Sequence, residues 1–182
     1  MATALHAFTY KDLEKMPDDG RRYELIGGMI VVSPAPSRVH QELVWRLALL
    51  LRTFVQAQKL GEVILAPFDV RYLGAGVQPD ILYVSNARLD ILRENHAAEA
   101  PDLIVEVLSP STRERDEGDK LTLYATGGVR EYWLADLVAQ TFRALALDAD
   151  RFRPIAPVGS VVPSALLPGL EVNIPDLFAD LP

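Results

Sequence analysis

The run Leu103-Ile104-Val105-Glu106-Val107-Leu108, closed by Ser109-Pro110, is apolar and rich in β-branched residues except for one carboxylate. A short apolar run that ends at turn residues is typical of a strand buried on both faces of a sheet. An ionised carboxylate is costly in that setting unless it is paired, hydrogen-bonded or bound to a metal. Glu106 therefore predicts a functional site on a central strand.

The composition around this run is that of a globular protein. The chain has 182 residues, of which 49% are hydrophobic, and this suits a single domain, residues 1–182, with a sizeable core. It has no cysteine, which excludes disulfide bonds, thiolate zinc sites and thiol nucleophiles. Because this cysteine usage fits a reducing compartment, we expect a cytoplasmic protein.

The apolar segments do not predict secretion or membrane insertion. Residues 1–20 contain no apolar core of a secretory signal. The longest apolar stretch, residues 43–55, is interrupted by Arg46 and Arg52 and is shorter than the roughly 20 residues that a bilayer requires. We expect no contact with membranes.

The net charge is −7, which argues against a protein that coats nucleic acid through a general basic field. Local basic surfaces are still possible, although a solvated surface is the ordinary explanation for scattered charges. The candidates near one predicted helix are Arg38, Arg46 and Arg52, and those after the Glu106 strand are Arg113, Arg115, Lys120 and Arg130.

The segments before Glu106 alternate between helix and strand signals. Thr9 and Asp12 form a variant capping box that predicts a short helix to Met16. Gly27-Gly28 between two apolar runs predicts an N-terminal hairpin of residues 23–26 and 29–32. The further elements expected are a helix from Ser37 to Leu60, strands over 62–65, 68–73 and 80–84, the last two separated by a loop Gly74-Ala75-Gly76, and a helical piece over 88–96.

After Glu106 the chain again mixes the two kinds of element. We expect a helix over 115–125, a strand over 131–134, a hairpin of 141–147 with 152–155, and a tail that packs through Leu166, Leu170 and Ile174. Asp102 is expected at the solvated end of the Glu106 strand. The mixed order predicts an α+β fold with a mixed sheet flanked by helices.

A second carboxylate has a position comparable to that of Glu106. Asp80 follows Pro79 and opens the apolar strand Asp80-Ile81-Leu82-Tyr83-Val84. If this strand neighbours the Glu106 strand, the two carboxylates can meet. Together with a backbone carbonyl, which we assign to Val107, they form a donor set that suits Mg²⁺ or Mn²⁺. Lys120, on the following helix, could then orient a water or neutralise charge that develops on a phosphate.

At this point the chain resembles the Uma2 family of restriction-endonuclease-like proteins, within the PD-(D/E)XK nuclease superfamily. The ordered segments that carry the resemblance are Tyr23-Glu24-Leu25-Ile26-Gly27-Gly28, Ser33-Pro34-Ala35 with His40-Gln41, Pro79-Asp80, residues 101–112 around Glu106, Asp119-Lys120 with Tyr124, and Gly128-Val129 with Glu131-Tyr132-Trp133 and Asp136. They extend over nearly the whole chain.

The resemblance implies a nuclease-type core in which Asp80 and Glu106 bind a divalent metal. The lysine that the superfamily pattern places two residues after the glutamate is replaced by Leu108. The resemblance implies that Lys120, from the next helix, supplies this group instead. Glu24 is then a further acid near the metal, and His40 a possible polar neighbour.

Each of these residues also has a structural explanation. Glu106 can form a buried ion pair with Arg130 or Lys120, and Asp80 can shape a strand entrance. Lys120 can pair with Asp116 on a solvated helix.

The remaining candidates have similar alternatives. Glu24 can pair across its hairpin, and His40 can be a structural hydrogen-bonding group. Tyr124 and Trp133 are interpreted as core packing.

The leading functional hypothesis is therefore a Mg²⁺-dependent endonuclease, a hydrolase of DNA phosphodiester bonds. A homodimer is plausible, since one chain offers little surface to grip a duplex. Two alternatives remain open: a binding or assembly module that keeps the nuclease fold without catalysis, and a metal-dependent hydrolase of small phosphate esters.

Overall fold

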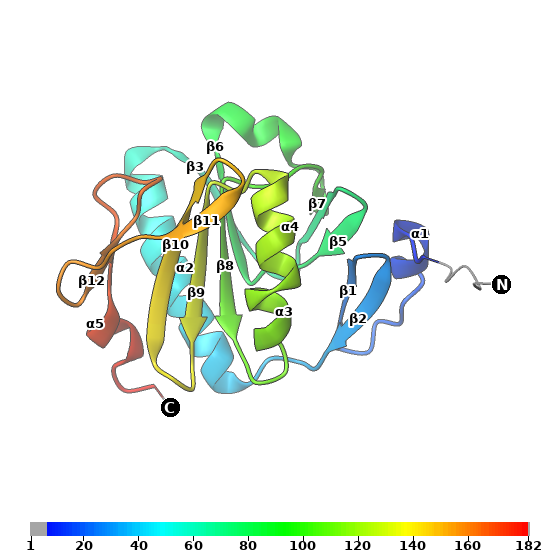
Figure 1. Cartoon of the computed structure of the whole chain (residues 1–182), viewed down its shortest axis with the longest axis horizontal. Helices are drawn as coiled ribbons and strands as arrows, with labels where there is room; N and C mark the ends of the chain where they lie inside the picture. Colours follow the sequence, from blue (N-terminus) through cyan, green and yellow to red (C-terminus); the bar gives the residue numbers. More distant parts are fainter. Residues whose placement is uncertain (1–6, 182) are drawn as a thin grey trace.

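The structure is a computed structural model that describes residues 7–181. Residues 1–6, which include part of the segment inspected for a secretory signal, and residue 182 lie outside the described residues. Figure 1 shows a central sheet with helices on both faces and a smaller sheet to one side. Among residues 7–181, no helix has the length and apolar character that crossing a membrane requires.

The central sheet has six strands in the order β11-β10-β9-β8-β6-β3. Strand β8 (Leu103–Leu108) pairs in parallel with β9 (Glu131–Asp136) and antiparallel with β6 (Ile81–Ser85). All six residues of β8 are buried, as its apolar sequence predicted. The outer strands are β3 (Gly61–Leu65), β10 (Thr141–Asp148) and β11 (Arg151–Pro154), each antiparallel to its neighbour. The predicted mixed sheet and the predicted hairpin of β10 and β11 are confirmed.

One face of the central sheet packs on α2 (Arg38–Gln58). The Ser37 side chain accepts a hydrogen bond from the His40 amide, as expected of a helix N-cap. Buried Leu43, Leu47 and other apolar residues of α2 lie in the same core cluster as Leu103, Val105 and Val107 of β8. The first turn of α2 is thereby held near the C-terminal end of β8.

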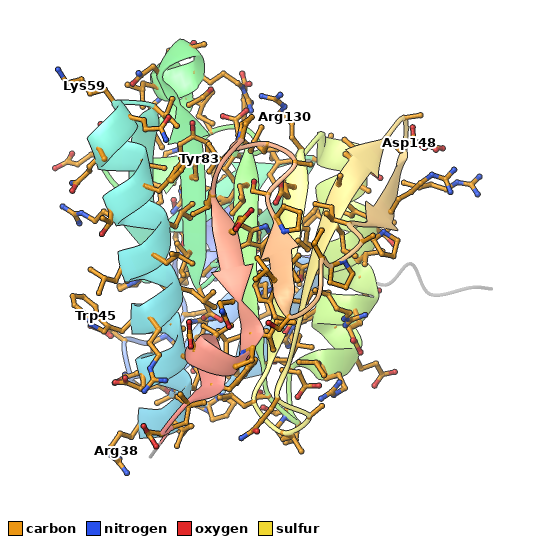
Figure 2. All side chains as sticks on the ribbon, turned by 90° about the vertical axis from the view of Figure 1, so that its left-hand side faces the viewer. Arg38, Trp45, Lys59, Tyr83, Arg130 and Asp148 are labelled. Carbon is orange, nitrogen blue, oxygen red and sulfur yellow. The ribbon has the colours of Figure 1, made fainter. Side chains whose placement is uncertain are left out.

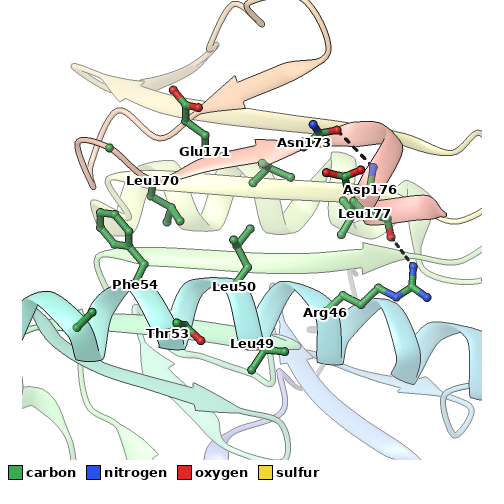
Figure 3. A pocket seen from close by; sticks show the side chains of 13 residues that line it. Arg46, Leu49, Leu50, Thr53, Phe54, Leu170, Glu171, Asn173, Asp176 and Leu177 are labelled. Carbon is green, nitrogen blue, oxygen red and sulfur yellow. Dashed lines mark hydrogen bonds between the residues drawn. The ribbon is translucent and has the colours of Figure 1, made fainter.

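The C-terminal tail covers the same face. It forms β12 (Val161–Pro163), β13 (Glu171–Asn173) and α5 (Ile174–Phe178). Leu170 is buried in this core, and Leu166 and Ile174 pack on it, so the predicted packing of the tail is confirmed. Figure 3 shows the groove between α2 and this tail, where Arg46 donates a hydrogen bond to the carbonyl of Leu177.

The other face of the central sheet carries two helices and a smaller five-stranded sheet of order β2-β1-β5-β4-β7. The predicted N-terminal hairpin is confirmed as β1 (Arg22–Ile26) and β2 (Met29–Ser33). The remaining elements here are α1 (Tyr10–Leu13), β4 (Asp69–Tyr72), β5 (Ala75–Val77), the 3₁₀ helix η1 (Asn86–Ile91), β7 (His96–Ala97), α3 (Arg113–Glu117) and α4 (Asp119–Gly127).

Three expectations about local structure were wrong. Ala75 and Gly76 are not a loop but part of β5, where Gly76 pairs with Leu25; a side chain at Gly76 would run into Leu13 and Tyr10, so the glycine permits close packing. The expected helix over 115–125 is broken at Gly118 into α3 and α4. The expected helical piece over 88–96 is the earlier, shorter η1, followed by β7.

Asp102 also differs from expectation, because it is fully buried rather than solvated. Its carboxylate accepts a hydrogen bond from the Ser85 amide at 2.8 Å and lies 3.3 Å from the guanidinium of Arg88. Asp102 therefore fixes the end of β6 to the start of β8, at the opposite end of these strands from Asp80 and Glu106.

A glycine at the start of β3 provides a test of this packing. A Cβ at Gly61 would overlap the backbone carbonyl of Val84 in β6, which no rotamer change can relieve. We expect Gly61→Ala to lower the free energy of unfolding by about 3 kcal/mol, measured by urea denaturation. Gly74→Ala is the matched control: it has a positive φ but no atom near the new Cβ, so its cost is about 1 kcal/mol. Equal losses for the two variants would contradict the close approach of β3 and β6.

Candidate active site

Asp80 and Glu106 lie side by side. Ile81 of β6 pairs with Val105 of β8, and the same antiparallel register places Asp80 opposite Glu106. Opposite residues of an antiparallel pair share one face of a sheet, so the two carboxylates point the same way. Each residue is only 2% exposed. The structure thus brings together the two acids that the sequence singled out.

Asp80 is held ionised by hydrogen bonds and charges from three elements. Its Oδ2 accepts the Val107 amide at 2.8 Å and lies 3.3 Å from Nε2 of His40, while Oδ1 lies 2.9 Å from the guanidinium of Arg22. Burial alone would raise the pKa of Asp80, but His40, Arg22 and the Val107 amide outweigh it and lower the pKa to about 2. Nε2 of His40 also lies 3.1 Å from the carbonyl oxygen of Val107.

Glu106 has a different environment. Lys120 donates to its Oε1 at 2.8 Å and the Tyr124 hydroxyl donates to the same oxygen at 2.7 Å, so Oε2 takes neither bond. Burial raises the pKa of Glu106 to about 8, and the nearby carboxylates of Asp116 and Asp80 add to this effect while Lys120 opposes it. The site can therefore hold a proton near neutral pH.

Lys120 lies at the centre of the cluster and is 1% exposed. Its ammonium lies 2.8 Å from Glu106, 2.9 Å from Glu24 and 3.4 Å from Asp116. Burial would lower the pKa of Lys120, but these three carboxylates raise it, so the ammonium stays charged. The predicted pair with Asp116 is present, although it is buried rather than on a solvated helix.

Glu24 enters the cluster from the small sheet. The residue opposite it in the hairpin is Val31, so the alternative explanation of Glu24 as a partner across the hairpin is wrong. Its Oε1 accepts the Gln78 amide at 2.9 Å as well as Lys120, and its Oε2 lies 3.7 Å from Nε of Arg115 without a hydrogen bond. Burial raises the pKa of Glu24, but Lys120 and the Gln78 amide lower it by more than burial raises it. The pKa is therefore below its usual value and the carboxylate is ionised.

The carboxylates of the cluster outnumber its permanent cations by one. Its carboxylates are Glu24, Asp80, Glu106 and Asp116, and its permanent cations are Arg22, Arg115 and Lys120. These groups balance when Glu106 is protonated, and one negative charge is uncompensated when Glu106 is ionised. In addition, Glu24 Oε2 and Asp116 Oδ1 are buried without a hydrogen-bond partner among the described residues. An uncompensated buried charge favours either a retained proton or a bound cation.

Three contributors were not recognised as site residues in the sequence. Arg22 alternates with Glu24 along β1 and so shares its face. Asp116 and Tyr124 each lie four residues from Lys120, before and after it, which is the spacing of neighbours on a helix surface. The spacing of these residues therefore indicated that they neighbour Glu24 and Lys120, but it did not indicate that they are buried. Arg130, proposed as a partner of Glu106, instead lies 3.7 Å from Asp102.

The cluster is reached from solvent on the Asp80 side. Two cavities, of about 220 Å³ and about 290 Å³, meet there and share Arg22 and His40 in their walls. Asp80 itself lines the smaller one. The larger one is lined by hydroxyl side chains of the loops before α2 and after β8.

Comparison with known proteins supports this picture. The model of the family "Uma2: Putative restriction endonuclease" matches residues 10–175. The fold is similar to that in the crystal structure of "a putative nuclease belonging to DUF820 from Anabaena variabilis ATCC 29413", with a TM-score of 0.81, 23% sequence identity, and coverage of 96% of this chain and 99% of that chain. At this identity the likeness shows the fold alone. A search of curated proteins gives no significant match.

The Lys120 cluster predicts a strong effect on stability. Lys120→Met would leave three buried carboxylates without their shared cation, so we expect the free energy of unfolding to fall by about 3–5 kcal/mol, measured by urea denaturation. Lys15→Met is the control: Lys15 pairs with Asp12 at 3.3 Å, but its side chain is 72% exposed, so its removal should leave stability nearly unchanged. Two variants of equal stability would contradict the central place of Lys120.

Proposed function

The chain belongs to the Uma2 family, and from this premise we propose that it is a divalent-metal-dependent endonuclease that hydrolyses phosphodiester bonds of DNA. The observation that carries the proposal is the juxtaposition of Asp80, directly before β6, and Glu106 of β8 on one face of the sheet, with Lys120 2.8 Å from Glu106. Acid, acid and lysine are the groups that the superfamily resemblance assigns to this chemistry.

The residues present fit a divalent ion. Asp80, Glu106 and the carbonyl of Val107 would hold it, and Mg²⁺ or Mn²⁺ accepts such oxygen donors while keeping several waters. Among the described residues, no three His, Asp or Glu side chains are arranged as a complete metal cage, which is compatible with an ion that takes one or two carboxylates from the protein. The uncompensated charge that appears when Glu106 is ionised would favour the same cation.

The ion, when bound, would lower the pKa of an attacking water and neutralise charge on the phosphate. The other groups then have separate tasks. Lys120 holds Glu106 in place and presents a fixed positive charge beside it, where it stabilises negative charge that develops during attack at phosphorus. Glu24 and Asp116 fix the ammonium, and His40 orients Asp80 through Nε2.

Arg22 is suited to receive the substrate. It contacts Asp80 and lines both cavities at the entrance to the cluster. A guanidinium can turn from a carboxylate to a phosphate without loss of charge pairing. Arg22 would thereby release Asp80 Oδ1 for the ion as the phosphate arrives.

The second candidate function is a nuclease-fold binding or assembly module without catalysis. A specific observation favours it: Arg22 and Lys120 already pair with Asp80 and Glu106 in this structure. If these cations are never displaced, the acids serve only to hold the fold together.

Cleavage assays test the leading proposal. Purified protein with Mg²⁺ or Mn²⁺ should cleave plasmid or oligonucleotide DNA, and Glu106→Gln should lower the rate about 100-fold or more because a metal ligand is lost. The amide has nearly the shape of the carboxyl group and can accept the bonds of Lys120 and Tyr124. Asp119→Asn, an exposed acid next to Lys120, is the control and should cleave at the normal rate. Cleavage by Glu106→Gln at the full rate would contradict the assignment of Glu106 as a metal ligand.

Metal titration separates the two candidate functions. Calorimetry with Mn²⁺ should detect binding at millimolar concentrations or below, and Asp80→Asn should weaken it about 10–100-fold. The amide oxygen that this substitution introduces can still accept the hydrogen bond of the Val107 amide, so the variant should fold. Failure of the wild-type protein to bind Mn²⁺ at millimolar concentrations would favour the non-catalytic module.

A further inference from the structure

Trp45 is unusual for a large aromatic residue of this protein. It is 60% exposed, whereas the other tryptophan, Trp133, is 1% exposed. Figure 2 shows Trp45 projecting from the outer side of α2, away from the sheet. It belongs to neither of the two core clusters that the described residues form. Packing of the chain therefore does not account for it.

The position of Trp45 is tied to the candidate active site. Trp45 lines the cavity of about 220 Å³ whose wall also contains Asp80, His40 and Arg22. This volume is below the roughly 300 Å³ at which pockets for drug-sized ligands begin. The cavity thus suits a group of the size of one nucleobase beside the phosphate-binding end of the site, and it does not suit a base pair.

Gln41 adds a polar group to the same wall. It lies one helical turn before Trp45, on the same surface of α2, and it lines the same cavity. A glutamine amide offers both donors and an acceptor, and these can pair with the exposed edge of a base. Leu65 and Ala66 also line the cavity, which therefore combines an aromatic side chain, apolar contacts and one amide.

The charge of the protein favours recognition by stacking. A net charge of −7 argues against a large affinity from many phosphate contacts. Stacking of a base on an aromatic side chain supplies affinity that does not depend on net charge, and it requires an unpaired base whose face is accessible.

We propose that the cavity beside Trp45 binds one unpaired nucleobase of the DNA strand that is cut, stacked on the indole, next to the phosphate at Asp80. This inference rests on the proposed function and names its substrate class: single-stranded DNA, or a nucleotide that has left its duplex. Gln41 contacts the edge of the stacked base. An intact duplex binds more weakly because the base must first be unpaired.

Tryptophan fluorescence provides a direct test that needs no cleavage. With EDTA present, a single-stranded oligodeoxynucleotide should quench the emission of the wild-type protein, because Trp45 is the exposed one of its two tryptophans. Trp45→Phe should abolish the quenching while the emission of buried Trp133 remains. The same oligonucleotide in a duplex should quench at higher concentration only.

Affinity provides the second readout, from the anisotropy of a labelled oligonucleotide. Stacking contributes about 1–3 kcal/mol per base, so Trp45→Ala should raise Kd about 5- to 150-fold, and Trp45→Phe by less. Leu49→Ala is the matched control, since Leu49 is 54% exposed one turn further along α2 but lines the groove of Figure 3 instead. It should leave Kd unchanged.

The outcomes distinguish this inference from the proposed function. Binding that depends on Trp45 without any cleavage would support the base site and refute the endonuclease. Cleavage with unchanged Kd in Trp45→Ala would refute the base site and leave the endonuclease standing. Absence of quenching, together with a change in sedimentation of Trp45→Ala, would show that this face is an interface between copies of the chain and would overturn the inference.

Discussion

The ammonium of Lys120 is the interaction on which the arrangement depends. It joins Glu24 of β1, Glu106 of β8 and Asp116 of α3, and so connects the small sheet, the central sheet and the helices that lie between them in Figure 1. A buried ion pair is weak evidence for high stability, since desolvation offsets much of the attraction. The Lys120 ion pairs instead fix how the three elements are oriented relative to one another. Moving any of these three carboxylates away from Lys120 would separate a buried charge from its partner, which is energetically costly. One arrangement of the three elements is therefore favoured over others.

The sequence predicted the centre of this site because the signals there are local. An acid inside a buried strand is visible from six residues, and the alternation of side chains fixes the face that it shares with Ile104 and Leu108. The hairpin at Gly27-Gly28 and the N-cap at Ser37 are equally local. What could not be predicted depends on tertiary contacts. The burial of Asp102 and Asp116, the use of Gly76 as a strand residue under Tyr10, and the selection of Lys120 over Arg130 as the partner of Glu106 follow from elements far apart in sequence.

The two acids differ in state although they are neighbours. Burial by itself raises the pKa of both acids. Asp80 accepts a backbone amide and contacts His40 and a guanidinium, which together lower its pKa to about 2, whereas Glu106 has only the Tyr124 hydroxyl and an ammonium shared with two other carboxylates, and its pKa stays raised, at about 8. A pair in which one group is ionised and the other can hold a proton would suit the reversible metal binding proposed for this site. Because both acids are buried, the difference between their pKa values comes from the number of donors around each one. The surrounding elements supply most of these donors, so they determine the difference more than the two strands do.

The residues of the site also differ in how they are reached from solvent. Arg22 and His40 line both cavities that open to solvent, and Asp80 lines the smaller one, whereas Glu106 and Lys120 line neither. In the proposed reaction a substrate phosphate would meet Arg22 and Asp80 first, and Lys120 would act through Glu106 from the interior. Because α2 supplies both His40 on the site side and Trp45 on the outer side of this entrance, the helix would position the proposed base and phosphate of one strand with a single rigid element. An acidic protein would gain from such an arrangement, since recognition would then rest on a few contacts near the phosphate rather than on an extended basic surface.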